Sequence, residues 1–224
     1  MLILTIETCT DISTLGLVRD GVVLGEAAFP SRHTLVKRLL VRLDWLLAEC
    51  GLVKGDIAAI AVSLGPGSFT GVRIGPAAAK TLAQWLHIPL LGIPTLEALA
   101  YPFRTCAHSL LAPLVNARRQ QVYAALFISE GGQLVRRTAD LALSPEPLAA
   151  LLHEHAGGCG QVLCIGLTEG LPDAFQQQFT GPVAAVRSLV TPHALAALAE
   201  QRLALGEQDD PMTLAPIYLR AAAD

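Results

Sequence analysis

A glycine-rich stretch, Ser63–Gly75, combines the residue types that most clearly suggest chemistry in this chain. Its glycines are interleaved with a proline and hydroxyl residues, in the order Gly65-Pro66-Gly67-Ser68-Phe69-Thr70-Gly71-Val72-Arg73-Ile74-Gly75. An apolar run, Ile57–Val62, leads into the stretch, and a helix-forming run, Ala77–Leu86, follows it. Glycines let the backbone approach a ligand or a neighbouring helix closely, and the first turn of a helix offers unpaired N–H groups. A strand, a glycine turn and a helix in this order predict a phosphate-binding type of corner.

A carboxylate followed by hydroxyl residues lies at the end of the first expected strand, in Glu7-Thr8-Cys9-Thr10. An acid in that place can position magnesium and nucleotide phosphates. The matching place in the second half holds Asn116, which is neutral, so ATP hydrolysis by this chain alone is disfavoured. The alternative is that Glu7 stabilises its own loop. The candidate nucleotide contacts are Glu7, Thr8, Gly65, Gly67, Ser68 and Thr70.

The spacing of the histidines argues against a metal site made by this chain alone. Two histidines that bind zinc from one helix face stand four residues apart. His33 has Lys37 at that spacing, whereas His153 and His155 are two apart and diverge around a helix. The sequence around Ser68 also lacks the Gly-x-Ser-x-Gly pattern of a nucleophile elbow, so we do not expect a serine hydrolase.

Hydrophobic periodicity indicates the elements that must hold these residues. Asp20-Gly21 is a hairpin turn signal between two early strands. Apolar residues at steps of three and four from Val36 to Cys50 mark one face of an amphipathic helix. The elements expected in the first half are strands Leu2–Ile6, Ser13–Arg19 and Val22–Phe29, helix Val36–Cys50, strand Ile57–Val62, helix Ala77–Leu86, strand Leu90–Gly92 and helix Thr95–Ala100.

This order, β-β-β-α-β-α-β-α, is typical of the ribonuclease H-like lobe of sugar kinases, actin and Hsp70. The second half reads as a shortened copy, with a last helix that Thr191 caps and Gly206 ends. We therefore expect an α/β protein of the actin-like ATPase (ribonuclease H-like) fold, with two lobes, the second reduced. The expected lobes are residues 1–105 and 106–224, and the C-terminal helix is expected to pack back on the first. The elements expected in the second half are strands Leu110–Val115, Gln121–Ile128, Leu134–Arg137, Val162–Ile165 and Pro182–Val186 and helix Pro145–His155.

Composition narrows the functional classes. Of the 224 residues 52% are hydrophobic and 16% charged, so the chain can bury a core, and a net charge of −3 provides no general attraction for nucleic acid. The long uncharged segments, Ile57–Val72 and Thr81–Leu96, are interrupted by glycine or proline, so we expect no membrane span. The N-terminus reads as a strand and not as a signal peptide. Five cysteines without a Cys-x-x-Cys pair fit reduced thiols in a cytoplasmic protein.

Two features suit contact with a partner, although core packing and solvation explain most such patterns. The helix Val36–Cys50 has a wide apolar stripe, and the helix after the glycine corner is rich in alanine, which lets helices approach closely. Arg118 and Arg119 lie on an expected turn between two strands, where a guanidinium can hold a carboxylate or phosphate. The candidate interface residues are Val36, Leu40, Arg73, Ala78, Ala79 and Arg118.

Together these pieces resemble the TsaB (YeaZ) family, a smaller and non-catalytic relative of TsaD in the bacterial synthesis of threonylcarbamoyladenosine on tRNA. The resemblance spans nearly the whole chain, and the glycine corner carries it most specifically. The other segments that contribute are Ile3–Thr8, Arg32-His33-Thr34, Asn116-Ala117-Arg118, Val122-Tyr123 and Pro216–Arg220.

The resemblance implies a scaffold or activator subunit that makes TsaD competent for threonylcarbamoyl transfer to N6 of the adenosine next to the anticodon. It implies a homodimer, or pairing with TsaD through the same first-lobe helices, with a TsaE homologue supplying ATP-driven turnover. ATP and magnesium would be used by the complex, and tRNA would be held through the complex. Neither a catalytic residue, nor a cofactor, nor a membrane is implied for this chain.

Three departures from the family pattern weaken an independent nucleotide site and leave a scaffold role unaffected. Glu7 replaces the usual aspartate, Asn116 replaces another, and Gln120-Gln121 stand where Gly-Glu is common. Pro76 stands where leucine is usual, so we expect the helix to begin near Gly75 or to bend there. Two alternatives stay open: a small-molecule kinase of the same fold, and a peptidase, for which we find no metal ligands or nucleophile–base pair.

Overall fold

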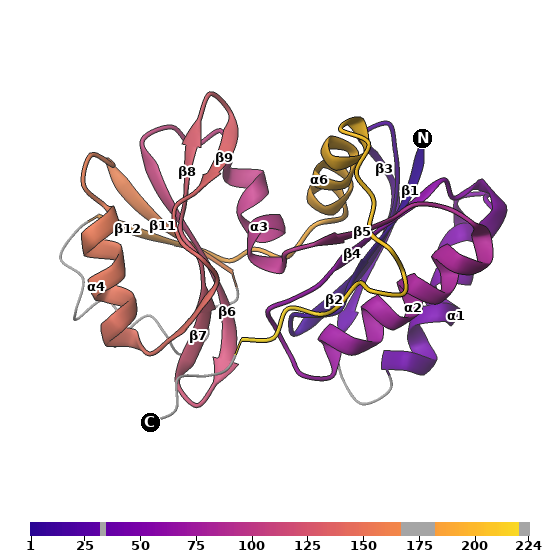
Figure 1. Ribbon diagram of the computed structural model, residues 1–224, viewed down its shortest axis with the longest axis horizontal. Coiled ribbons are helices and arrows are strands. Elements are labelled where there is room, and N and C mark those ends of the chain that lie inside the picture. Colours follow the sequence, from indigo (N-terminus) through magenta and orange to yellow (C-terminus); the bar gives the residue numbers. More distant parts are fainter. Residues whose placement is uncertain (32–34, 167–181, 220–224) are drawn as a thin grey trace. The chain divides into compact units, whose positions relative to one another are not determined.

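The computed structural model describes residues 1–31, 35–166 and 182–219. The chain divides into two compact units (Figure 1). The first unit consists of Met1–Ala98 and Val190–Ile217. The second unit consists of the described parts of Leu99–Leu189 and Tyr218–Asp224. The resemblance segment Arg32-His33-Thr34 and residue Arg220 lie outside the described residues. Each unit contains one sheet, so the structure is a mixed α/β protein as predicted.

The first unit is a five-stranded sheet in the order β3-β2-β1-β4-β5. The first three strands pair antiparallel, whereas β1, β4 and β5 run parallel. The central strand β1 is buried along its whole length, which explains its nearly continuous apolar sequence. The strands are β1 (Leu2–Glu7), β2 (Ile12–Arg19), β3 (Val22–Pro30), β4 (Ala59–Ser63) and β5 (Leu90–Ile93).

Helices cover both faces of this sheet (Figure 1). On one face α1 (Leu35–Glu49) and α2 (Gly71–Leu86) form a core with the inward residues of β1, β2 and β4. On the other face α6 (Pro192–Ala204) contacts all five strands. The side chain of Thr191 accepts a hydrogen bond from the Ala194 N–H at 3.2 Å, as the predicted cap requires.

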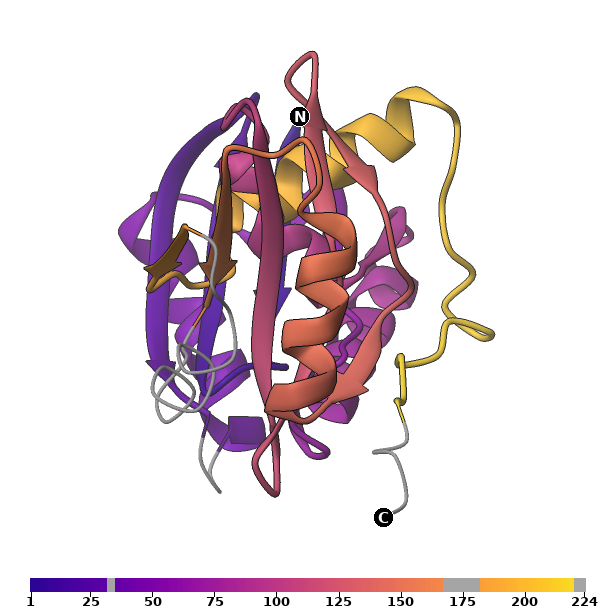
Figure 2. The same ribbon diagram turned by 90° about the vertical axis from the view of Figure 1, so that its left-hand side faces the viewer.

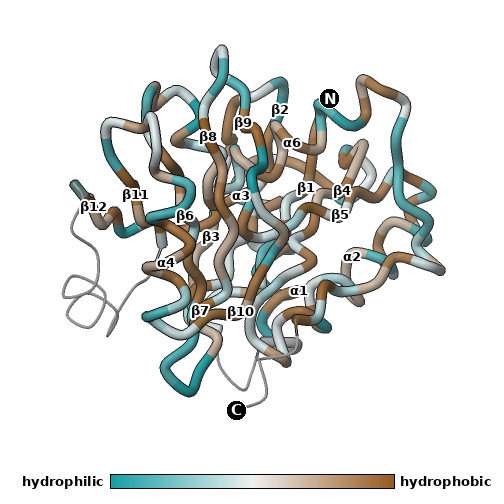
Figure 3. Tube along the Cα trace, turned by 60° about the vertical axis from the view of Figure 1, so that its left-hand side comes forward, coloured by the Kyte–Doolittle hydropathy of each residue, from teal (hydrophilic) through white to brown (hydrophobic). Residues whose placement is uncertain are grey.

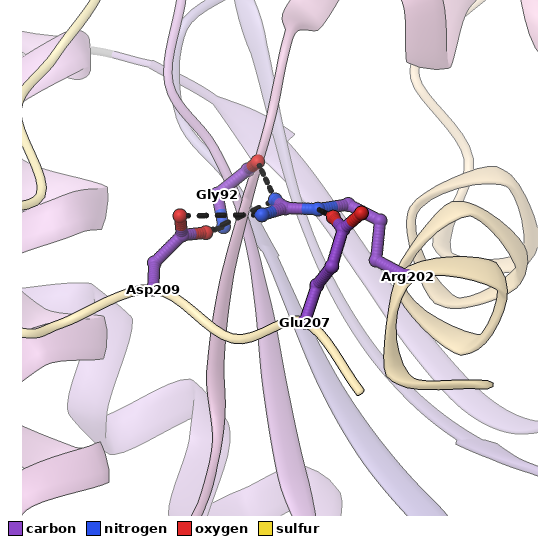
Figure 4. A network of polar contacts seen from close by, with 4 residues as sticks. All are labelled: Gly92, Arg202, Glu207 and Asp209. Atoms are coloured by element: carbon purple, nitrogen blue, oxygen red, sulfur yellow. Dashed lines mark hydrogen bonds and ion pairs between the residues drawn. The ribbon is translucent and has the colours of Figure 1, made fainter. Parts of the chain in front are cut away.

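A segment from the far end of the chain closes the β5 edge of this sheet (Figure 4). The Arg202 guanidinium donates to the Gly92 carbonyl at 2.9 Å and to the Asp209 carboxylate at 3.0 Å, and Asp209 also accepts from the Gly92 N–H at 2.7 Å. Glu207 binds the other side of Arg202 at 2.9 Å. The hydrogen bonds to Asp209 raise the pKa of Arg202 above its already high ordinary value, so its guanidinium stays positively charged.

The second unit is built around the long strand β6 (Ser109–Arg118), in a sheet of order β10-β7-β6-β11-β12. A hairpin of β8 and β9 pairs with the start of β6. Helix α4 (Pro145–His155) packs on the sheet through Leu148 and Leu152 (Figure 2). The remaining strands are β7 (Gln121–Ala124), β8 (Phe127–Glu130), β9 (Gln133–Arg136), β10 (Leu141–Leu143), β11 (Gln161–Ile165) and β12 (Val183–Val186).

Hydropathy follows the elements: the buried strands are hydrophobic, whereas several of the connecting turns are hydrophilic (Figure 3). The predicted helices Thr95–Ala100 (α3) and Pro145–His155 are confirmed with the same bounds. The single strand predicted over Gln121–Ile128 is wrong, because it is two strands that pair at different places along β6. The strand β10 was not predicted from the sequence.

The start of α2 also differs from the prediction. The helix begins at Gly71, not near Gly75, and Pro76 lies inside it. Proline near the start of a helix loses one backbone hydrogen bond but keeps a helical φ, so the first turns can form ahead of it. The glycines of the corner therefore belong partly to the helix itself.

Candidate functional site

The carboxyl ends of β1 and β4 meet in one corner, because the two strands are parallel neighbours with Ile6 opposite Val62. The turn after β1 then contacts the residue that ends β4: the Thr8 N–H donates to the Ser63 hydroxyl at 3.4 Å. Glu7, Thr8 and Ser63 are fully buried. These three polar residues therefore lie in the interior, where each needs a hydrogen-bond partner within the protein.

The Glu7 carboxylate is bound by the turn that follows it. One oxygen accepts the N–H groups of Cys9 at 2.6 Å and Thr10 at 2.9 Å, and the other accepts the Thr10 hydroxyl at 3.0 Å. Burial raises the pKa of Glu7 to about 7, and the hydrogen bonds from Thr10 and Cys9 oppose this rise. This is the geometry of an acid that holds its own loop, which is the alternative left open for Glu7 by the sequence.

The glycines of the corner face the same turn. A Cβ on Gly67 would lie 2.2 Å from the Cys9 carbonyl oxygen, and one on Gly71 would lie 1.8 Å from the Thr8 carbonyl oxygen. A Cβ on Gly75 would lie 2.3 Å from the Thr8 hydroxyl. The space that these glycines leave is therefore occupied by the chain, and α2 packs directly against the turn after β1.

Hydrogen bonds fasten this contact. The Thr8 hydroxyl donates to the Gly71 carbonyl at 2.7 Å, and the Ser68 N–H donates to the Cys9 carbonyl at 2.7 Å. The Ser68 hydroxyl accepts the Gly71 N–H at 3.0 Å and so satisfies a donor at the start of α2. The donors among these groups, the Thr8 hydroxyl and the N–H groups of Ser68 and Gly71, are of the kind that a phosphate would use, and here they bind oxygens of the chain itself.

The remaining nucleotide candidates are divided between the corner and the surface. Gly65 exchanges two hydrogen bonds with Thr95, at 2.8 and 3.0 Å, which ties the corner to the start of α3. Thr70 is exposed. The structure therefore brings five of the six candidates together and leaves Thr70 outside.

The candidate interface residues fall in different environments. Leu40 on α1 is 48% exposed, and Arg73 on α2 is exposed with its guanidinium 3.6 Å from the centre of the Phe69 ring. Ala78 is half-buried, whereas Ala79 is fully buried in the core under α2. Ala79 therefore cannot reach a partner in the folded chain, because α2 turns it toward its own sheet. Val36 is the second residue of α1, and its side chain lies outside the described residues.

Sequence reasoning missed the apolar side chains that α1 and α2 expose. Val41 is 67% exposed, and both tryptophans of the chain, Trp45 and Trp85, are 53% and 64% exposed. Phe69, just before α2, is 67% exposed. The signal was available for the helix residues: Val41 and Trp45 fall between the buried leucines of α1, and Trp85 lies off the buried face of α2, at positions where polar residues are usual.

The described residues hold no group of three or more histidine, cysteine, aspartate or glutamate side chains that could bind a metal ion. Within the same described ranges, no helix has both the length and the apolar character needed to cross a bilayer.

Comparison with known proteins defines the class to which this fold and corner belong. Residues 29–214 match the family model for TsaD, tRNA N6-adenosine threonylcarbamoyltransferase. A solved YeaZ structure from Pseudomonas aeruginosa covers 97% of this chain and 99% of its own, with a TM-score of 0.80 and 26% identity. A ROK hexokinase from Thermus thermophilus, at a TM-score of 0.52 and 12% identity, shares the fold. The predicted actin-like ATPase fold is thus confirmed.

Curated relatives give the branch within that class. The chain is 36% identical to the tRNA threonylcarbamoyladenosine biosynthesis protein TsaB of Bacillus subtilis over 62% of this chain and 61% of that protein. It is 34% identical to TsaB of Escherichia coli over 69% of this chain and 65% of that protein. These alignments thus span somewhat less than two thirds of each relative. The chain belongs to the TsaB (YeaZ) family, as its sequence motifs predicted.

Proposed function

We propose that this chain takes part in the biosynthesis of threonylcarbamoyladenosine in tRNA as the subunit that binds and activates a TsaD-type transferase. Its family membership supports the pathway. The observation that carries the subunit role is the exposed apolar surface of α1 and α2, which we call the helix surface: Leu40, Val41, Trp45 and Trp85, with Phe69 and Arg73 beside the start of α2. Large aromatic side chains and arginines dominate the binding energy of protein interfaces.

The helix surface is supported by a rigid core. Leu39, Leu43, Leu46 and Leu47 of α1 pack with Ala79, Leu82 and Ala83 of α2 against the same face of the sheet. The exposed side chains are therefore presented by helices whose other faces are fixed, which lowers the entropy lost on binding. We propose that the transferase pairs with this surface, that a homodimer uses it when no transferase is bound, and that a TsaE homologue joins the assembled pair.

The activity test is reconstitution. Cognate transferase, adenylate-forming enzyme and TsaE homologue are mixed with tRNA, threonine, bicarbonate and ATP, with and without this chain. Modified adenosine is then measured by nucleoside mass spectrometry. We expect modification only when the chain is present, and equal modification without it would contradict the proposal.

The surface test replaces exposed apolar residues by arginine. Trp85→Arg should lower co-purification with the transferase at least tenfold, because an interface tryptophan typically contributes about 2 kcal/mol or more. Val41→Arg should also lower it, because the substitution places a charge in an apolar contact. Val53→Arg is the matched control, since Val53 is 65% exposed in the same unit but lies outside both helices. Retained binding by both helix variants would move the interface elsewhere.

A small-molecule kinase of the same fold is the alternative. The Glu7 carboxylate and the N–H groups of the corner already bind one another, which weighs against a nucleotide phosphate there. Calorimetry with magnesium and millimolar ATP separates the two functions. Heat that requires magnesium and is lost in a Glu7→Gln variant would favour the kinase.

A further inference from the structure

A pocket of about 440 Å³ lies between the last turn of α2 and the segment that follows α6. All of its lining belongs to the first unit. The lining combines apolar side chains, among them Ile88 and Pro211, with the polar side chains of Gln84, Asp209 and Asp210. Long basic side chains have the same division, because they carry a charged end on an apolar stem. The pocket is therefore suited to a side chain of that kind.

The electrostatic character of the pocket is negative. Two acids line it, and its described lining residues include neither lysine nor arginine. The pocket also lies at the carboxyl end of α2, where aligned peptide dipoles place partial negative charge, and the last turn of this helix has no basic residue. His87, which caps the helix, is the other titratable side chain of the described lining. Acids beside the negative end of a helix repel it, so a cation bound between them would stabilise both.

The two acids of the pocket differ in how their charge is balanced. The Arg202 guanidinium donates to both oxygens of Asp209, at 3.0 and 3.3 Å (Figure 4). The donors to the Asp210 carboxylate among the described residues are neutral: the Met212 N–H at 2.8 Å and the Thr213 hydroxyl at 3.4 Å. Asp210 is exposed. The pocket thus contains one acid that is paired with a guanidinium and one that offers its charge to an external cation.

The pocket adjoins the helix surface. Trp85 follows Gln84 in α2 and is 64% exposed, and Met212 follows Pro211 and is 75% exposed. The Gln84 amide donates to the Met212 sulfur at 3.1 Å, so the two segments meet beside the pocket. A protein that covers Trp85 therefore reaches the pocket as well, which favours an occupant carried by that protein. An RNA is disfavoured, because its phosphates have the same sign of charge as the pocket.

We propose that this pocket receives a basic side chain, arginine or lysine, of the transferase, with its charged end on Asp210 and its stem on the apolar lining. This inference rests on the proposed function for the identity of the partner, and it adds a polar contact to the apolar helix surface. Charge complementarity gives an interface its register and specificity more than its affinity. The pocket therefore fixes the orientation of the partner on α1 and α2.

The first test removes the charge and keeps the turn. Asp210→Asn retains an oxygen that can accept the Met212 N–H. The affinity of the full chain for the cognate transferase is measured by surface plasmon resonance at about 0.1 M and about 1 M salt. We expect Asp210→Asn to weaken binding about threefold to fivefold at the lower salt and less at the higher, because salt screens an exposed pair. Glu26→Gln is the control, since Glu26 is exposed on β3 at the other edge of the same sheet.

A second pair of variants separates charge from packing. Gln84 lines the same pocket, so Gln84→Glu should strengthen transferase binding and Gln84→Lys should weaken it. Two changes of opposite sign at one position are not expected if the side chain only packs. Weaker binding by both variants overturns the inference, and so does an Asp210→Asn variant that binds like wild type at both salt concentrations. An equal loss in Glu26→Gln also overturns it, because net charge alone then explains the effect.

The pocket can also be tested without the transferase. The chain alone is titrated with N-acetyl-arginine amide, and the amide NMR signals of His87 and Asp210 are followed. We expect shifts that are absent in Asp210→Asn and absent with N-acetyl-citrulline amide, the uncharged analogue of the same shape. If the transferase does not bind the wild-type chain, the proposed function fails and this titration decides the pocket. Unchanged signals, or equal shifts with the citrulline compound, then overturn it.

Discussion

The corner between β1 and α2 and the turn between β6 and β7 use their polar groups in opposite ways. In the corner, Glu7 accepts the N–H groups of Cys9 and Thr10, and the Thr8 hydroxyl binds the Gly71 carbonyl, all within the protein. In the turn, Arg118 and Arg119 are exposed, and their left-handed φ angles of 69° and 48° strain the backbone. The polar groups of the glycine-rich corner thus bind one another inside the protein, whereas the β6–β7 turn exposes charged side chains to solvent.

Burial explains the difference. A buried polar group must find a partner inside the protein. The polar groups of a buried motif therefore form hydrogen bonds with neighbouring residues and are not left for a ligand. An exposed group at the tip of a hairpin is in contact with water, so its burial does not force it to find a partner inside the protein. A motif therefore indicates where the backbone comes close to something, and the tertiary structure decides whether that is a ligand or another part of the chain.

The largest effect should come from filling the corner. In Gly71→Ala the new Cβ would lie 1.8 Å from the Thr8 carbonyl oxygen, which is backbone and cannot rotate away. We expect the free energy of unfolding to fall by about 3 kcal/mol or more, measured by urea denaturation. Gly55→Ala is the control, because a Cβ there meets no atom within 4 Å. Equal stability of the two variants would show that the turn after β1 does not pack as described.

The acid of the corner should give a pH-dependent effect of similar size. Because the Glu7 pKa rises from 4.5 to about 7 on folding, its stabilising contribution is complete below pH 4.5 and is lost as pH rises through 7. Glu7→Gln removes this titration. The stability of Glu7→Gln relative to wild type should therefore increase by about 3 kcal/mol between pH 4.5 and pH 8. The same substitution at exposed Glu49 serves as control, and a constant difference at Glu7 would contradict the burial.

The turn should respond to substitution in the opposite sense. Arg119→Gly adopts the left-handed φ of 48° without a Cβ, so the free energy of unfolding should increase by about 1 kcal/mol. Arg119→Ala keeps the Cβ and should show no such gain. If both variants behave alike in denaturation, the turn is not strained, and the contrast with the corner loses its basis.

Much of the architecture was predictable because it depends on local pattern. The stripe of leucines predicted α1, the cap at Thr191 predicted α6, and the glycine motif marked the β4–α2 corner and identified the family. The corner's partners were less accessible, although the spacing of Gly71 and Gly75 by four residues places both on one face of a helix. The start of α2 was misjudged at Pro76, because tertiary contacts to Thr8 and Cys9 favour helix formation ahead of the proline.

The sequence by itself determined the order of elements, the hydrophobic faces and the motifs that tie the chain to its family, because periodicity and turn chemistry are local properties. Only the tertiary structure decided that Thr8 and Cys9 fill the glycine corner, that Ala79 is turned into the core while Trp45 and Trp85 are exposed, and that Arg202 and Asp209 close the β5 edge. These outcomes depend on residues far apart in the chain meeting in space. Their distances and burial, not their types, set what each can do.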